Sequence, residues 1–119
     1  MVVVVIALPS GLFELRQIEV ENQRPTCDFC HGKTVTGGTI GSDSDPTDFR
    51  VFTQDHEDNC SSPTSVFSLD FLHEDDYRGD IGFLKCRQGD YFDCNLDDLA
   101  TVTALVHDYM EKTNREVAQ

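Results

Sequence analysis

The segment around Cys27 and Cys30 carries the residue types most able to bind a metal. Two residues separate these cysteines, and His31 follows directly. A Cys-x-x-Cys step lets two thiolates reach one zinc ion, and structural zinc takes four ligands, commonly as two close pairs. His56 and Cys60, four residues apart, supply a second pair if that stretch forms a helical turn. We therefore predict a structural zinc bound by Cys27, Cys30, His56 and Cys60.

Three other residues are alternative ligands for one position of this site: His31, Cys86 and Cys94. Cys86 and Cys94 lie on either side of Gln88-Gly89, which is typical of a hairpin turn. A two-residue turn pairs Cys86 with Tyr91 and places the two thiols on opposite faces, whereas a three-residue turn reverses that conclusion. With the two-residue turn, both are expected to be small buried apolar side chains.

The sequence also allows chemistries other than a structural zinc. Cys27 and Cys30 are alternatively a redox pair or buried thiols, although the Gly/Thr-rich sequence after them is not typical of a redox motif. A catalytic zinc would need an open position and a base, for which Glu57 is the candidate. A calcium loop is a further alternative, with three closely spaced carboxylates: Asp43, Asp45 and Asp48. No phosphate-binding, nucleophile-elbow or dinucleotide motif occurs in the sequence.

The charge of the chain is strongly negative and unevenly distributed. Among 119 residues, 22 acids face 9 bases, for a net charge of −13 and a pI near 4.3. Residues 41–80 hold eleven of the acids against Arg50 and Arg78, a net charge of −9. Direct binding to nucleic acid or to an anionic membrane needs a basic surface, so the composition argues against both. The field of this stretch instead attracts a basic partner. Solubility, or adaptation to high salt, is the alternative explanation.

We expect the contact surface for the partner to lie near residue 75. Carboxylates spaced along a surface can imitate the phosphates of a nucleic-acid strand, and a neighbouring tyrosine is a frequent energetic hot spot of protein interfaces. The candidate partner-binding residues are Asp70, Glu74, Asp75, Asp76, Tyr77 and Asp80. The function this suggests is a small acidic inhibitor that docks on a basic, nucleic-acid-binding surface of a partner protein and blocks it. Immunity proteins against nuclease toxins and phage anti-defence nucleic-acid mimics act in this way, and the analogy is one of size and charge alone. The alternatives are a zinc-stabilised adaptor module and a small metal-dependent enzyme.

Cysteine content and the apolar run at residues 2–8 indicate the compartment. The run is too short to span a bilayer and has no Lys or Arg before it, so we interpret it as a buried strand and not as a signal peptide. Five cysteines, an odd number, are typical of reduced thiols. We expect a cytoplasmic protein with a single domain, residues 1–119.

Apolar patterns predict mainly strands before residue 95. Residues 2–8 and 12–20 flank Pro9-Ser10-Gly11 and predict a hairpin, although the second arm also fits a helix. A second hairpin turns at Gln88-Gly89 within residues 81–96. Further strands are expected at 33–40, 49–53 and 65–72.

The C-terminal segment has the pattern of an amphipathic helix over residues 96–113. Asn95 is a good N-cap, and Asp97 and Asp98 fall in the first turn, where the helix dipole favours anions. An apolar stripe recurs at three- and four-residue steps: Leu96, Leu99, Val102, Val106, Tyr109 and Thr113. We predict an α+β fold, in which this helix packs on an antiparallel sheet beside an irregular, acidic and zinc-bound middle segment.

Overall fold

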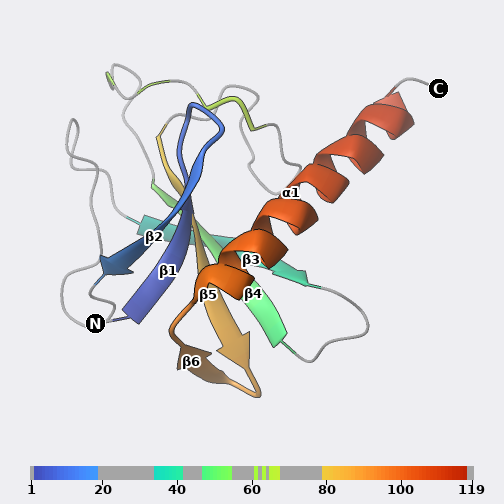
Figure 1. The fold of residues 1–119 in the computed structure, drawn as a ribbon. Helices are drawn as coiled ribbons and strands as arrows, with labels where there is room; N and C mark the ends of the chain where they lie inside the picture. Colours follow the sequence, from blue (N-terminus) through green and yellow to red (C-terminus); the bar gives the residue numbers. More distant parts are fainter. Residues whose placement is uncertain are drawn as a thin grey trace.

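The computed structural model describes residues 2–18, 34–41, 47–54, 61, 63, 65–67 and 79–117. Within these residues, six strands form one antiparallel sheet, and one helix follows them. The elements are β1 (Val2–Ala7), β2 (Phe13–Ile18), β3 (Thr34–Gly41), β4 (Thr47–Gln54), β5 (Ile81–Arg87), β6 (Asp90–Phe92) and α1 (Leu96–Val117). The strand order is β2-β1-β5-β4-β3, and β6 pairs with β5 (Figure 1). The predicted α+β arrangement is confirmed.

The first hairpin forms where the sequence predicts it. β1 and β2 pair antiparallel, with Val5 opposite Leu15 in the middle of the ladder. The chain turns between Leu8 and Leu12, where Gly11 has a φ of 102°, a conformation that glycine adopts at little cost. β1 pairs with β5 on its other edge. Val4, Val5 and Ile6 of β1 are buried, because both faces of the sheet are covered there by apolar clusters.

The second hairpin also turns as predicted, at Gln88 and Gly89. Both residues have positive φ, 52° and 84°, which is the geometry of a type I′ turn. The resulting register places Cys86 opposite Tyr91. The two-residue turn is therefore confirmed.

β3 and β4 extend the sheet beyond β5. β3 has the length of the strand expected at 33–40 and is shifted by one residue, whereas β4 is longer than the strand expected at 49–53. They pair with each other from Thr34 opposite Gln54 to Gly41 opposite Asp48, with a bulge between Thr36 and Gly38. Both expected strands are therefore present, and β4 begins two residues earlier and ends one residue later than expected.

The strand expected at 65–72 is wrong for residues 65–67, which the structure describes outside any strand. The backbone amide of Val66 donates to the carbonyl of Pro9, 2.9 Å away, so this segment crosses the β1–β2 turn. Phe67 is buried, and its ring lies edge-on to the ring of Phe13 with 5.3 Å between centroids. A tertiary contact, and not strand pairing, explains why Phe67 is apolar.

The helix begins with a reciprocal cap. The amide of Asp98 donates to the side-chain oxygen of Asn95 at 3.0 Å, and the amide of Asn95 donates to the carboxylate of Asp98 at 2.9 Å. These two bonds satisfy donors that a helix start leaves without partners. The predicted N-cap is confirmed, and α1 continues to Val117, past the expected end at residue 113.

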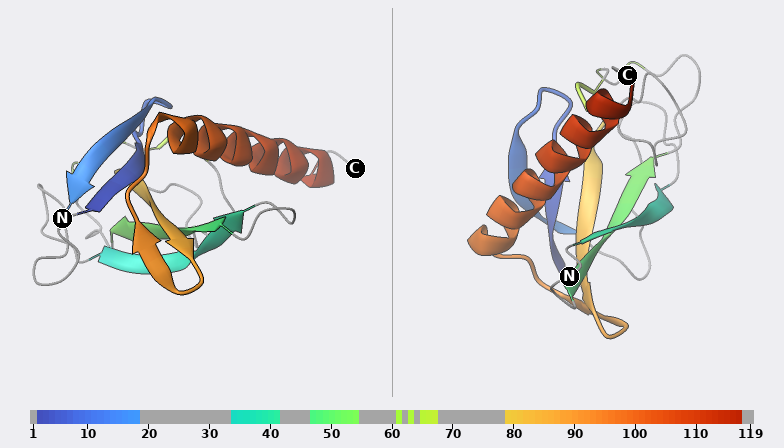
Figure 2. Two further views of the ribbon diagram at one scale, coloured as in Figure 1. Left: turned by 60° about the horizontal axis from the view of Figure 1, so that its bottom comes forward. Right: turned by 90° about the vertical axis from the view of Figure 1, so that its right-hand side faces the viewer.

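One face of the sheet and the inner face of α1 enclose the main core. Val102 and Val106 are buried at 0% and 1% exposure, and they lie in one cluster with Val5, Phe83 and Val51. The opposite face of the sheet carries a smaller cluster around Val4, Ile6 and Leu84. Figure 2 shows the sheet curling, so that β3 and β4 lie across from α1 while β1 and β2 lie beside it.

The predicted helix stripe needs one correction. Leu99 and Tyr109 pack against the core as expected, but Leu96 is 74% exposed. Leu96 is the first residue of α1, and it belongs to neither apolar cluster of the described residues. Leu105 and Met110 join the core, although they were not part of the predicted stripe.

Candidate functional site

The four predicted zinc ligands, Cys27, Cys30, His56 and Cys60, lie outside the described residues. Within the described part of the chain, no three histidine, cysteine or carboxylate side chains gather as a metal site would require. The zinc site therefore stays a prediction.

Most of the predicted partner-binding residues also lie outside the described residues: Asp70, Glu74, Asp75, Asp76 and Tyr77. Asp80, directly before β5, is described. Its carboxylate lies 3.0 Å from a guanidinium nitrogen of Arg16 on β2, with both side chains partly exposed. Burial opposes the charge on Arg16, but its contacts with Glu14 and Asp80 outweigh this and raise its pKa. Arg16 therefore compensates part of the negative charge that Asp80 contributes to the surface.

The lysine and arginine side chains that the structure describes contact other residues of the protein. Besides Arg16, Lys85 contacts Asp98 at 3.1 Å, and Arg87 donates to the Thr47 hydroxyl at 3.1 Å. Arg50 donates to the Tyr91 hydroxyl at 2.7 Å, and its guanidinium carbon lies 5.6 Å from the centre of that ring. Every lysine and arginine whose side chain the structure describes thus has a partner inside the protein.

Several carboxylates belong to exposed residues. They lie on β4, on β6, in the segment before α1 and along α1: Asp48, Asp90, Asp93, Asp97, Asp108 and Glu111. Some of them also take part in internal contacts, for example Asp93, which accepts a hydrogen bond from the amide of Val3. The exposed cations among the described residues are Arg16, Arg50 and Arg87, so the described surface is acidic because its exposed acids outnumber its exposed bases.

Cys86 and Cys94, the two cysteines described, lie on opposite faces of the sheet, as the two-residue turn predicts. Cys94 belongs to the main core, and Cys86 packs against the smaller cluster on the other face. Burial raises the pKa of Cys94 to about 11, and the charge of Asp98 adds to this. Burial also raises the pKa of Cys86, although Arg50 partly offsets it. Both thiols are therefore protonated near neutral pH and are poor nucleophiles. They cannot share a metal ion.

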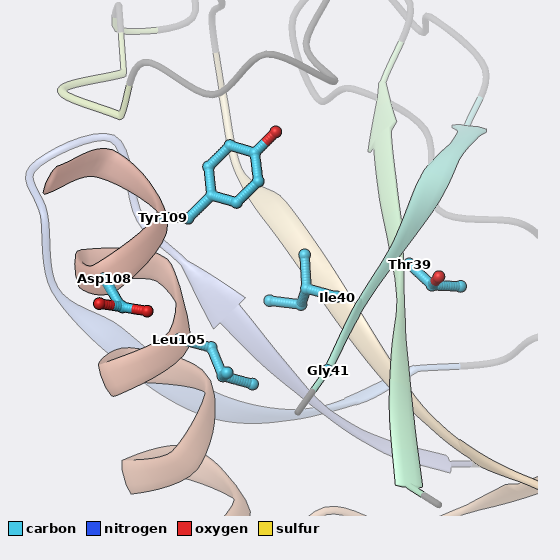
Figure 3. A pocket seen from close by; sticks show the side chains of 6 residues that line it. All are labelled: Thr39, Ile40, Gly41, Leu105, Asp108 and Tyr109. Carbon is cyan, nitrogen blue, oxygen red and sulfur yellow. The ribbon is translucent and has the colours of Figure 1, made fainter. Parts of the chain in front are cut away.

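A hollow of about 210 Å³ opens between α1 and β3. Figure 3 shows the side chains of Ile40 and Leu105 pointing toward one another across it, whereas Thr39 points away from the helix. Six residues line the hollow: Thr39, Ile40, Gly41, Leu105, Asp108 and Tyr109. It is smaller than the pockets that hold drug-sized ligands. Sequence reasoning missed this hollow, because its walls come from segments far apart in the chain.

The segment from Asp90 to Asp98 exposes apolar side chains next to acids. Tyr91, Phe92 and Leu96 are 47%, 44% and 74% exposed. Tyr91 and Phe92 project from opposite faces of the β5–β6 hairpin, as neighbours on a strand do.

The comparisons give no relatives: the chain matches no protein-family model, no curated protein and no solved structure. Among the described residues, no helix has the combination of length and apolarity that crossing a membrane requires. Any functional conclusion therefore rests on this chain's own residues.

Proposed function

We propose that this protein is a small acidic binding protein that docks on a basic surface of a partner protein and blocks it. The carrying observation is the excess of negative charge. The chain has a net charge of −13, residues 41–80 hold eleven acids against two bases, and exposed acids outnumber exposed bases on the described surface. A surface of this kind attracts a partner with lysine and arginine side chains and repels polyanions.

The proposed contact surface is the acidic stretch that ends at Asp80, with Asp75 and Asp76 at its centre and Tyr77 as its apolar anchor. Carboxylates spaced along a surface resemble the phosphates of a nucleic-acid strand. The expected target is therefore a surface that normally binds nucleic acid. We expect Asp80 to contribute less than its neighbours, because Arg16 compensates part of its charge.

A charge-reversal experiment with a matched control tests this proposal. The immobilised protein is used to capture partners at low salt, and binding is compared for Asp75→Lys with Asp76→Lys and for Asp90→Lys with Asp97→Lys. Both double variants change the net charge equally, and Asp90 and Asp97 belong to the described exposed acids. We expect the first variant to lose the partner and the second to keep most of the binding.

Salt provides the second arm of this test. The screening length contracts from about 10 Å at 0.1 M salt to about 3 Å at 1 M, so association should slow as salt is added. Binding that is indifferent to salt and to both double variants would show that the acidic charge serves solubility and not docking. Binding weakened equally by both double variants would show that the net charge, and not the surface around Asp75 and Asp76, attracts the partner.

A further inference from the structure

The hollow between α1 and β3 has the lining of a site for one long cationic side chain. Ile40 and Leu105 form apolar walls that face one another (Figure 3), and both pack against the main core. Such walls suit a methylene stem, which arginine and lysine bury while their charged ends stay near water.

The polar lining suits the charged end of the same side chain. Asp108 and Tyr109, neighbours on α1, both line the hollow. Figure 3 shows the ring of Tyr109 extending from α1 toward the strands, and the carboxylate of Asp108 lying beside α1. Each also has an interaction within the chain. A guanidinium stacks on aromatic faces and forms paired hydrogen bonds with carboxylates, and it is more weakly hydrated than an ammonium. The combination therefore favours arginine.

We infer that this hollow receives an arginine side chain from the basic partner. The inference rests on the proposed function, because the partner's basic surface supplies the arginine. The volume of about 210 Å³ limits the occupant to one side chain or a molecule of similar size. The hollow thus adds a shape-selective contact to an attraction that is otherwise electrostatic and weakens with salt.

Titration with small probes tests the inference without a purified partner. Arginine with blocked termini, N-acetyl-arginine amide, is added to isotopically labelled protein, and amide and methyl NMR signals are followed. N-acetyl-citrulline amide has the same length without the charge, and methylguanidinium has the charge without the stem. We expect the arginine probe to shift signals of Ile40 and Leu105 in a saturable way, and both controls to bind more weakly.

Two variants separate a specific site from general attraction to an acidic protein. Asp108→Asn removes the charge in the hollow, whereas Asp97→Asn removes one from an exposed residue of α1 that does not line it. We expect Asp108→Asn to weaken the arginine probe about three- to fivefold, as partly exposed ion pairs of up to about 1 kcal/mol imply, and Asp97→Asn to have little effect. Equal responses to arginine and citrulline, equal losses in the two variants, or shifts away from the hollow would overturn the inference.

This result is independent of the test of the proposed function. The Asp75 and Asp76 reversal leaves the described lining residues of the hollow, Ile40, Leu105 and Asp108 among them, unchanged. Partner binding that needs those two acids, together with no arginine response at Ile40 and Leu105, would refute the arginine site and leave the docking proposal standing.

Discussion

Lys85 on β5 donates a hydrogen bond to Asp98 in the first turn of α1, with 3.1 Å between Nζ and Oδ2. The same oxygen accepts the amide of Asn95, so one carboxylate both caps the helix and joins it to the sheet. Asp98 is 9% exposed, which makes these contacts hard for water to replace.

Asp98→Ala should therefore destabilise the protein by about 1–3 kcal/mol, since a helix cap and a charge-assisted hydrogen bond are lost together. Asp97→Ala is the matched control, because Asp97 lies in the same turn of α1 and is exposed. Its replacement removes only the favourable interaction with the helix dipole and should lower the free energy of unfolding by less than about 1 kcal/mol. Urea unfolding measures both. Equal losses would mean that the contact of Asp98 with Lys85 and Asn95 adds nothing.

The helix face is tested by placing a charge at two apolar positions of α1. Val106→Asp should prevent folding, because Val106 is 1% exposed and an unpaired buried charge costs several kcal/mol out of a total stability of about 5–15 kcal/mol. Leu96→Asp should be tolerated, because Leu96 is 74% exposed and a helix start favours an anion. Circular dichroism during thermal unfolding compares them. A Val106→Asp variant that melts like the wild type would contradict the packing described for α1.

The thiol of Cys94 should make stability fall in alkaline solution. Its pKa is raised from 9.0 to about 11 in the folded protein, mainly by burial. When the pKa of a group is higher in the folded protein than in the unfolded chain, its contribution to stability is complete at pH values below the pKa of the unfolded chain. That contribution is lost as the pH rises toward the pKa of the folded protein. At about 1.4 kcal/mol per pKa unit, the loss attributable to Cys94 reaches about 2 kcal/mol by pH 11.

The comparison of wild type with Cys94→Ala isolates this effect, because the other titrating groups are common to both. Urea unfolding between about pH 8 and pH 11 should show the wild type losing stability more steeply than the variant. A stability difference that stays constant over this range would contradict the raised pKa of Cys94.

The zinc prediction is tested by metal analysis. Protein purified without chelator should carry about one zinc per chain, and a chelator should lower the melting temperature, since ligand binding and folding are coupled. Cys27→Ser should lose the metal. Cys86→Ser should keep it, since Cys86 packs against the smaller apolar cluster of the sheet. If the purified protein contains no zinc, the predicted zinc site is wrong.

Features with a local cause were predictable from the sequence. The Gln88-Gly89 turn follows from residues that accept positive φ, and the start of α1 follows from Asn95 and Asp98 at capping spacing. Both depend on neighbours within a few positions, so a linear pattern contains the necessary information.

Features with a tertiary cause were not predictable. Phe67 fits an alternating strand pattern, but it is buried because it meets Phe13 from a distant hairpin. Leu96 continues the helical stripe, yet it is 74% exposed, because burial depends on what packs against the start of α1 and not on the spacing alone. The hollow joins Ile40 with Leu105, and no sequence pattern shows that a curled sheet brings β3 to α1.

Competition between nucleic acid and this protein for the captured partner tests the central claim most directly. The complex is formed at low salt, and a short DNA duplex, a short RNA or polyglutamate at the same charge concentration is then added. If the acidic surface occupies a nucleic-acid-binding site, DNA or RNA should displace the protein at concentrations where polyglutamate does not. A complex that persists at saturating DNA and RNA would contradict the proposal that this protein blocks such a site.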